Sequence, residues 1–326
     1  MNAIKDEVGK GWNVAAIPSQ VGRRVLITGA NSGIGYHAAV ELAHNGAHVL
    51  LACRDKARGD AALARMRAAN PRARAEVVLL DLASLESVRA FAAEDLARGV
   101  PLDLLINNAG VMAPKKRLET ADGFEIQFGT NVLGHFALTA MLLPALERAS
   151  ARGPLKPRVV TIASIAHKRG QLNFDDLQST KNYNPMEAYR QSKLANLLLA
   201  FELDRRLRPD GTPAPGVMSV AAHPGVANTN LFQAGEYSAL EKLVRRGIGV
   251  AIGAFLNSEA QGAVPTLFAA TAPDVTNGGY YGPQGYEEMR GGDVGPAEVA
   301  PQARDRRAAA RLWRECERLT GVSLLS

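Results

Sequence analysis

Short apolar runs alternate with longer stretches rich in alanine and leucine along most of the chain. The apolar runs are continuous and rich in β-branched residues, a pattern typical of parallel strands that are buried on both faces. Strands are expected at Val25–Thr28, Val49–Ala52, Glu76–Leu80, Leu104–Ile106, Val159–Ile162, Met218–Ala222 and Tyr280–Tyr281. Helices are expected at Ile34–Asn45, Ala57–Ala69, Leu85–Ala97, Phe124–Ala149, Met186–Arg208 and Gln261–Ala270. This alternation predicts one α/β domain, a doubly wound parallel sheet of about seven strands with helices on both faces.

The limits of this domain follow from where the alternation begins and ends. Residues 1–22 form an N-terminal extension, and the alternation occupies residues 23–290. Residues 291–326 are rich in charge and carry a helical pattern near Ala308–Leu319, which predicts a C-terminal helical tail on the surface or on a partner subunit. The polar stretches inside the alternation are short, so a second domain is not expected.

The composition is that of an ordinary globular enzyme, with 47% hydrophobic and 21% charged residues among 326. The net charge is +6, but the Lys and Arg residues are scattered along the chain, which indicates a basic surface rather than a nucleic-acid site. Such a surface can attract an anionic cofactor. Cys53 and Cys316 suggest neither a disulfide framework nor a metal site, and the histidines show no metal spacing. Two isolated thiols favour a reducing compartment, and a cytoplasmic location is predicted.

The hydrophobic pattern also bears on membranes. The chain has no run of 18 or more apolar residues, and its first residues, MNAIKDEVGKGW, lack the apolar core of a signal peptide. Gly247–Leu256 is apolar and follows Lys242, Arg245 and Arg246, but it is too short to span a bilayer. It fits a buried or pocket-lining helix, or a helix that lies on a membrane surface. Stable membrane insertion is not expected.

A glycine-rich turn, TGANSGIG, follows the first strand from Thr28 to Gly35. Glycine is needed where backbone approaches a pyrophosphate closely, and the helix that begins here offers free N–H groups and a favourable dipole to an anion. Taken alone, the turn is also compatible with an ordinary strand–helix connection. Its position directly after a strand favours a dinucleotide site.

Tyr189 and Lys193 are four residues apart and therefore lie on one face of a helix. A free tyrosine has a pKa of about 10, which makes it a poor acid–base catalyst at neutral pH. A nearby ammonium favours the phenolate and lowers that pKa. This spacing is weak evidence alone, but together with the glycine-rich turn it indicates a nicotinamide-dependent oxidoreductase.

Seven motifs occur in an order that resembles the short-chain dehydrogenase/reductase family, over about Val25 to Gly285. They are TGANSGIG, Asp81-Leu82, Asn107-Asn108-Ala109-Gly110, Asn131, Ser164, Tyr189 with Lys193, and His223-Pro224-Gly225. The phrases TNVLGHFALT, NFDDL and AYRQSKLAN are most similar to the branch of retinol dehydrogenases and WW-domain oxidoreductases, although a WW domain is not recognised.

The resemblance implies a Rossmann fold with the cofactor at the carboxyl ends of the strands. In the family the aspartate after the third strand meets the adenine, the Asn-Ala-Gly turn lines the adenine-ribose end, and the Pro-Gly turn holds the carboxamide and phosphates. Carried over residue by residue, the cofactor-binding set is Gly29, Asn31, Ser32, Gly33, Ile34, Gly35, Arg54, Asp81, Leu82, Asn108, Ala109, Gly110, Tyr189, Lys193, Pro224, Gly225, Val226 and Thr229.

The end of the second strand predicts which cofactor is preferred. An NAD-preferring enzyme usually places a carboxylate here, whereas this position is Cys53, followed by Arg54. A guanidinium suits a 2′-phosphate through paired, charge-assisted hydrogen bonds. Asp55 complicates the prediction, since it could neutralise Arg54 or face the ribose itself. The sequence favours NADP(H) over NAD(H).

The resemblance also implies the catalytic set, Asn131, Ser164, Tyr189 and Lys193. Tyr189 would be the general acid in reduction and the base in oxidation, and Lys193 would hold the nicotinamide ribose and lower the tyrosine's pKa. Ser164 would donate a hydrogen bond to the substrate carbonyl. Asn131 would bend its helix and bind a water in a proton relay. Ser164 and Tyr189 are 25 residues apart, a gap that the retinoid branch shares, and the inserted loop is expected beside the pocket.

In the family the stretch here at about 228–262 is a lid over the substrate, and its apolar content favours a lipophilic carbonyl or alcohol. An inserted helix pair that completes the core is an equally good interpretation of this stretch. Two alternative functions are considered: reduction of a carbon–carbon double bond, as in protochlorophyllide reductases, and an NADP-binding sensor or scaffold without catalysis. Against the first, this chain lacks the extra cysteines that those reductases carry. Against the second, the Ser, Tyr and Lys are all intact.

The family usually assembles through its two long helices, here around Phe124–Ala149 and Met186–Arg208. Their apolar residues exceed what one face of a sheet needs, so a homodimer or homotetramer is expected. The insertion and the C-terminal tail could instead block that face, and members of the retinoid branch could be monomers.

Overall fold

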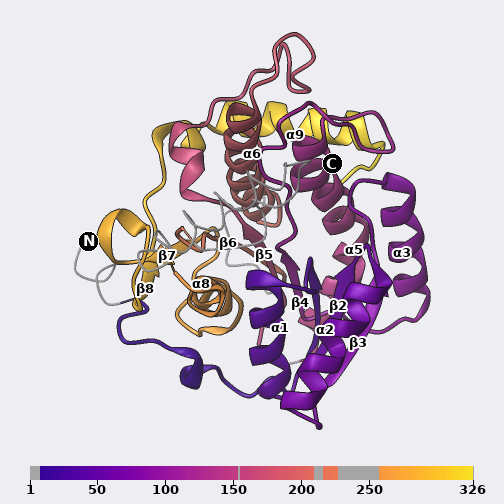
Figure 1. Ribbon diagram of the computed structural model, residues 1–326, viewed down its shortest axis with the longest axis vertical. Helices are drawn as coiled ribbons and strands as arrows, with labels where there is room; N and C mark the ends of the chain where they lie inside the picture. Colours follow the sequence, from indigo (N-terminus) through magenta and orange to yellow (C-terminus); the bar gives the residue numbers. More distant parts are fainter. Residues whose placement is uncertain (1–7, 153–154, 209–215, 227–256, 326) are drawn as a thin grey trace, which may run out of the picture.

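One central sheet organises the molecule (Figure 1). The computed structural model describes residues 8–152, 155–208, 216–226 and 257–325. Its strands are β1 (Arg24–Thr28), β2 (His48–Cys53), β3 (Arg74–Leu79), β4 (Leu104–Asn107), β5 (Arg158–Ile162), β6 (Met218–Ala222), β7 (Tyr280–Pro283) and β8 (Val294–Pro296). In the part of the chain described, their order is β3-β2-β1-β4-β5-β6-β7-β8, and β1 lies in parallel between β2 and β4. The predicted doubly wound α/β fold is confirmed.

The eighth strand was not predicted. β8 pairs antiparallel with β7, while β1 to β7 are the parallel strands that the sequence predicted. Its three residues, VGP, include glycine and proline, which do not favour a strand. β8 forms because it is an edge strand, where proline is tolerated.

Helices cover both faces of the sheet and bury two separate cores. The helices are α1 (Gly33–His44), α2 (Lys56–Ala69), α3 (Leu85–Ala97), α4 (Ile126–Phe128), α5 (Gly134–Ser150), α6 (Pro185–Arg206), α8 (Glu259–Thr271) and α9 (Arg306–Thr320). One core joins the sheet to α3, α5, α6 and α9, and the other joins it to α1, α2 and α8. Strands that are buried on both sides explain the continuous apolar runs.

The helix predicted at Phe124–Ala149 is present as one continuous helical run over Ile126–Ser150. Between α4 and α5 the chain forms a π-helical turn at Gly129–Leu133, with Asn131 at its centre. Such turns are often found at functional sites, and asparagine weakens the α-helical alternative. Among the described residues, Ile126–Ser150 is the stretch long and apolar enough to cross a membrane by length and composition, and 89% of its most apolar window is buried in the protein.

The predicted lid at about 228–262 lies almost entirely outside the described residues, as do Thr229 and Gly247–Leu256. The chain is described again from Asn257, and α8 begins at Glu259 behind a capping box formed by Ser258 and Gln261. The lid and the membrane-surface alternative therefore stay predictions.

The C-terminal helix α9 lies against α6 and α5 (Figure 1). Trp313 is buried, and its ring packs edge-on against Phe136 of α5 at 5.1 Å between centroids. The guanidinium of Arg206 in α6 lies 4.6 Å from the Trp313 ring. Gln191–Ala200 of α6 is buried at every position, so this part of the helix is covered on all sides.

This arrangement bears on the predicted assembly. Side chains of the two long helices contact α9, which favours the alternative in which the C-terminal tail blocks the pairing face, and the oligomeric state stays a prediction. One correction concerns charge. The basic residues are not all scattered, because the exposed Arg307, Arg311, Arg314 and Arg318 follow one face of α9.

We expect the intact chain to sediment as a monomer of 34.7 kDa, because its own helix occupies the family's pairing face. Trp313→Ala should lower the free energy of unfolding by about 3–5 kcal/mol, since it empties a packed aromatic site. Arg314→Ala, at the exposed neighbouring position, should change it by less than about 0.5 kcal/mol. A stable dimer of the intact chain in sedimentation would contradict this expectation.

Candidate active site

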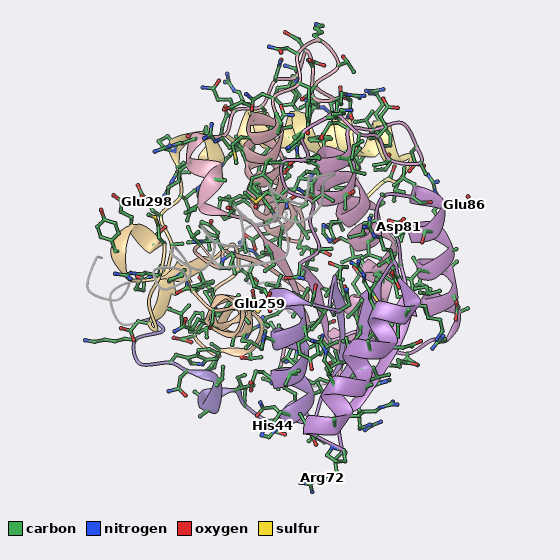
Figure 2. All side chains as sticks on the ribbon, in the orientation of Figure 1. His44, Arg72, Asp81, Glu86, Glu259 and Glu298 are labelled. Atoms are coloured by element: carbon green, nitrogen blue, oxygen red, sulfur yellow. The ribbon has the colours of Figure 1, made fainter. Side chains whose placement is uncertain are left out.

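A cavity of about 1590 Å³ opens at the carboxyl ends of the parallel strands. Figure 2 labels Asp81 just beyond the carboxyl end of β3 and Arg72 just before its amino end. The two labels therefore mark the end of the strands that faces the cavity and the opposite end. The predicted site residues that line the cavity are Gly29, Asn31, Ser32, Gly33, Ile34, Gly35, Arg54, Asp81, Leu82, Asn108, Ala109, Gly110, Ser164, Tyr189, Lys193, Pro224, Gly225 and Val226. Asn131 lies behind the wall, and Thr229 is outside the described residues.

The glycine-rich turn leaves space that side chains would fill. Gly29 and Gly33 have φ values of +67° and +61°, which favour glycine. A Cβ on Gly35 would lie 2.4 Å from Asn108 Nδ2 and 2.7 Å from the Gly29 carbonyl oxygen. Ser32 is the N-cap of α1, yet its side chain makes no capping hydrogen bond. The first N–H groups of α1 are thus not capped by Ser32 and are available to an anion.

Thr28, at the end of β1, holds the neighbouring turn in place. Its Oγ1 accepts hydrogen bonds from the N–H groups of Asn108 and Ala109, both at 2.9 Å. The same oxygen lies 2.9 Å from His135 Nε2, and His135 Nδ1 lies 3.0 Å from the Asn131 carbonyl oxygen. Burial lowers the pKa of His135 to about 4, so the ring is neutral at pH 7. The neutral ring has one N–H group, which Nδ1 donates to the Asn131 carbonyl, so Nε2 accepts a hydrogen bond from the Thr28 hydroxyl.

The Asn131 side chain is fully engaged. Its Oδ1 accepts from the Val111 N–H at 2.7 Å, and its Nδ2 donates to the Val111 carbonyl and to Ser192 Oγ, both at 3.0 Å. It therefore fixes the segment after Gly110 against α6. A π-helical turn is present at Asn131, while its predicted roles in bending the helix and in a water relay stay predictions.

The adenine end of the cavity is basic. Arg54 is exposed there, and Arg58 and Arg65 of α2 line the same region. Asp55 is the N-cap of α2, accepts from the Arg58 N–H at 3.0 Å, and pairs with the Arg58 side chain at 3.7 Å. The Asp55 carboxylate thus caps the helix and pairs with Arg58, while Asp55 also lines the cavity, so its contact with the ribose stays a prediction. Arg58 and Arg65 were missed because they lie inside a helix with no recognisable motif.

Ser164 and Tyr189 meet at the wall of the cavity. Tyr189 is buried in α6, and Ser164 is the N-cap of the short helix η3 (Ile165–Arg169). Burial raises the pKa of Tyr189 to about 12, while a hydrogen bond from the Ser164 hydroxyl opposes this rise. A donor that lowers the tyrosine's pKa also stabilises negative charge on an oxygen at this position.

Lys193 is buried one helical turn from Tyr189. Its ammonium donates to the Ile162 carbonyl at 2.9 Å and lies 5.9 Å from the centroid of the Tyr189 ring. Burial lowers the pKa of Lys193 to about 8. In the protein alone burial raises the pKa of Tyr189 and lowers that of Lys193, and the lowering of the tyrosine's pKa by Lys193 stays a prediction.

The inserted loop borders the cavity only at its start, through Lys168 and Arg169, and the rest of it lies elsewhere. Gln191 of α6 accepts from the Asn173 N–H at 2.9 Å and donates to the Leu177 carbonyl at 3.0 Å. Arg311 of α9 lies 4.1 Å from the Phe174 ring. Residues 170–184 therefore pack on α6 and α9, and the cavity wall skips from Arg169 to Met186.

His167, three residues after Ser164, is buried and has structural partners. Its Nδ1 lies 2.7 Å from the Ser164 carbonyl oxygen, and its Nε2 accepts from the Ala300 N–H at 3.3 Å. Burial is the main cause of its lowered pKa, so the ring is neutral. Its contacts tie the Ser164 turn to the segment before α9.

The turn after β6 is packed under a segment that sequence analysis did not identify. Val226 donates its N–H to the Met289 carbonyl at 2.8 Å, and a Cβ on Gly225 would lie 2.4 Å from the same oxygen. Lys168, Glu288 and Met289 also line the cavity. No motif marks Lys168 or Glu288, because their proximity depends on the tertiary fold.

The residues present fit a nicotinamide dinucleotide. The glycine turn at the start of α1 suits a pyrophosphate, Arg54 suits an anionic group near the adenine, and Ser164 with Tyr189 supplies hydrogen-bond donors at the other end. Among the described residues no group of three or more His, Cys, Asp or Glu could hold a metal ion.

Comparisons with known proteins agree with this geometry. The family model described as short chain dehydrogenase matches residues 23–236. The chain is 42% identical to polyprenol dehydrogenase of Mus musculus over 307 residues, covering 94% of this chain and 86% of that protein. It is 39% identical to retinol dehydrogenase 14 of Homo sapiens over 316 residues, covering 92% and 87%.

Solved structures show the same relation. The crystal structure of an uncharacterized protein from Mycobacterium Paratuberculosis has a TM-score of 0.74 and 39% identity, covering 96% of this chain and 98% of that one. An NAD(P) dependent gluconate 5-dehydrogenase from Beutenbergia cavernae with bound NADP has a TM-score of 0.59 and 26% identity, covering 80% and 95%.

The packing of the glycine turn generates a prediction. Gly35→Ala should lower the free energy of unfolding by about 1–3 kcal/mol, because its methyl group would displace Asn108 Nδ2 from the Thr28 carbonyl, to which it donates at 2.8 Å. Chemical denaturation measures this change. Gly216→Ala is the matched control, since a Cβ there meets nothing within 4 Å, and it should leave stability unchanged or raise it by up to about 1 kcal/mol. Equal effects of the two variants would contradict the proposed close approach.

Proposed function

Because this chain belongs to the short-chain dehydrogenase family, we propose that it transfers hydride between NADP(H) and a carbonyl or alcohol of a lipophilic substrate. It is an oxidoreductase that acts on CH–OH donors with NAD(P), as its named relatives do. The preference for NADP(H), the catalytic residues and the substrate class are the parts that we propose.

The observation that carries the proposal is the convergence at one end of the cavity. Ser164, Tyr189 and Lys193 come from two elements, lie within one wall, and are continuous with the glycine turn through a single cavity. A Tyr and a Lys that occurred on one helix by chance would require neither a serine beside them nor a glycine turn in the same cavity. The arrangement therefore favours an active enzyme over a sensor or scaffold.

In reduction, Tyr189 donates its proton to the substrate oxygen, and Ser164 donates a hydrogen bond to the same oxygen. The bound nicotinamide supplies the hydride in this direction and accepts it in the other. A tyrosine with a pKa near 12 is protonated at pH 7 and so is ready to act as an acid. The single hydroxyl proton of Ser164 is donated to the substrate oxygen, where it stabilises the negative charge that develops there.

Lys193 and Asn131 hold this arrangement. The Lys193 ammonium is buried, and we propose that it contacts the nicotinamide ribose, where the cofactor's phosphate charge favours its protonated form. Asn131 fixes the Val111 segment and Ser192, and both Asn131 Oδ1 and Lys193 Nζ lie close to Gly110. A carbon added at Gly110 would lie 3.3 Å from Asn131 Oδ1 and 3.8 Å from Lys193 Nζ, so glycine keeps this passage open.

The substrate class is inferred from relatives and from the cavity. The names of the relatives refer to retinol and polyprenol, both lipophilic alcohols. Near Ser164 the described cavity wall includes the apolar side chains of Val111, Met112, Ile165 and Met186. These residues suit an apolar chain beside the reacting carbon. We propose a cytoplasmic location, which fits the two cysteines, since both are free thiols.

The arginines at the adenine end generate the cofactor prediction. Arg54→Ala should weaken NADPH binding by roughly 1–3 kcal/mol and barely change NADH binding, because it removes a charged hydrogen bond to the 2′-phosphate. Fluorescence titration measures both affinities. Arg72→Ala removes the same charge at the opposite end of strand β3, and it should leave the affinities for NADPH and NADH unchanged. Equal dissociation constants of the wild type for NADPH and NADH would overturn the preference.

The catalytic wall generates a second prediction. Tyr189→Phe keeps the ring and removes the acidic proton, so turnover of a lipophilic aldehyde such as all-trans-retinal should fall about 100- to 10,000-fold with NADPH affinity nearly intact. Ser164→Ala should lower turnover by about 100-fold or more. Lys193→Ala should weaken both turnover and cofactor binding, since its ammonium serves both.

Steady-state kinetics and cofactor titration of each variant test this pattern. Tyr183→Phe is the matched control, because Tyr183 bonds to the Pro114 carbonyl at 2.9 Å and does not line the cavity. It should retain nearly full turnover. A Tyr189→Phe enzyme with most of its activity would remove the mechanism and favour double-bond reduction or a binding role.

A further inference from the structure

Two walls of the nicotinamide end of the cavity are joined by one side chain, that of Glu288. One wall is the turn that contains Ser164 and continues into η3, and the other is the Pro224–Val226 turn after β6. The two turns are not consecutive in the chain. The distance between the two turns determines where a nicotinamide ring held by the second turn would lie relative to the hydroxyl group of Ser164.

Glu288 reaches this position from a strained backbone. Glu287 and Glu288 have φ values of +47° and +56°, in the left-handed region that favours glycine. Non-glycine residues persist there when the surrounding structure holds them, and they concentrate at functional sites. The strain turns the segment so that the Met289 carbonyl receives the Val226 N–H and the Glu288 carboxylate faces inward.

The Glu288 carboxylate contacts both walls. Its Oε2 lies 3.1 Å from the ammonium of Lys168, which is in η3, and 3.5 Å from His223 Nε2. Its Oε1 accepts from the Glu298 N–H at 2.6 Å. Burial opposes ionisation, but His223, the Glu298 N–H and Lys168 together hold the pKa of Glu288 at about 2. The group is therefore an anion at any physiological pH.

The surroundings of the His223 ring determine which of its nitrogen atoms faces Glu288. His223 is fully buried, and its Nδ1 accepts from the Gly225 N–H at 3.2 Å, which leaves the ring proton on Nε2 facing Glu288. A Cβ on Gly282 would lie 1.9 Å from His223 Nε2, so a side chain at position 282 would clash with the ring. The ring thus lies between the Glu288 carboxylate and the Gly225 N–H of the Pro224–Val226 turn.

We propose that Glu288 is a positioning residue that joins Lys168 to His223 and thereby sets the nicotinamide seat relative to Ser164. The proposal rests on the proposed function, because it concerns the cofactor of that reaction. Glu288 acts through the two turns that it connects.

The test separates the two halves of the cofactor. Glu288→Gln keeps the shape of the side chain and removes its charge. It should weaken NADPH binding by about tenfold, as expected for loss of a charge-assisted contact, yet leave binding of 2′-phospho-ADP-ribose, which lacks nicotinamide, within about twofold. Calorimetric titration measures both ligands. If the enzyme prefers NADH, then NADH and ADP-ribose form the corresponding pair.

Glu298→Gln is the matched control. Glu298 Oε2 also pairs with Lys168, at 2.7 Å, but its side chain is 74% exposed and does not bond to His223. It should leave both affinities within about twofold. Equal weakening of NADPH and the fragment by Glu288→Gln would indicate a general structural role and overturn the proposal. Unchanged NADPH affinity, or the same loss in the Glu298 control, would also overturn it. A wild type that binds neither cofactor would instead contradict the proposed function.

Discussion

One hydroxyl group, that of Thr28, connects the two ends of the site. It fixes the backbone of Asn108 and Ala109 beside the glycine turn, and through His135 it reaches the carbonyl of Asn131. The nucleotide end and the catalytic end are therefore parts of one buried hydrogen-bond network. Because each group in this chain already has a partner, movement at one end would leave a buried polar group without a hydrogen bond at the other.

Burial sets the chemistry at the catalytic end. It raises the pKa of Tyr189 and lowers that of Lys193, so the protein alone favours the neutral form of both groups. Ser164 opposes the effect at Tyr189 by donating a hydrogen bond. An anionic cofactor beside Lys193 would favour its ammonium again. On this account the cofactor completes the electrostatic environment in which Tyr189 releases its proton.

Much of the fold and the site could be predicted from sequence, because strands buried on both faces leave continuous apolar runs and ligand-binding turns follow them. The three-residue strand β8 and the packing of α9 could not, since both depend on distant partners such as β7 and Phe136. The link between Lys168 and Glu288 was hidden for the same reason. The roles assigned to the catalytic residues stay predictions until variants are measured.

The central claim is that hydride passes between nicotinamide and a carbonyl carbon held beside Ser164 and Tyr189. It is tested most directly with NADPH that carries deuterium at C4 of the nicotinamide, prepared as each epimer, and a lipophilic aldehyde such as all-trans-retinal. Mass spectrometry of the alcohol should find one deuterium on the carbinol carbon from one epimer and none from the other. Deuterium on a carbon of a reduced double bond, or a product formed without deuterium from either epimer, would contradict the account.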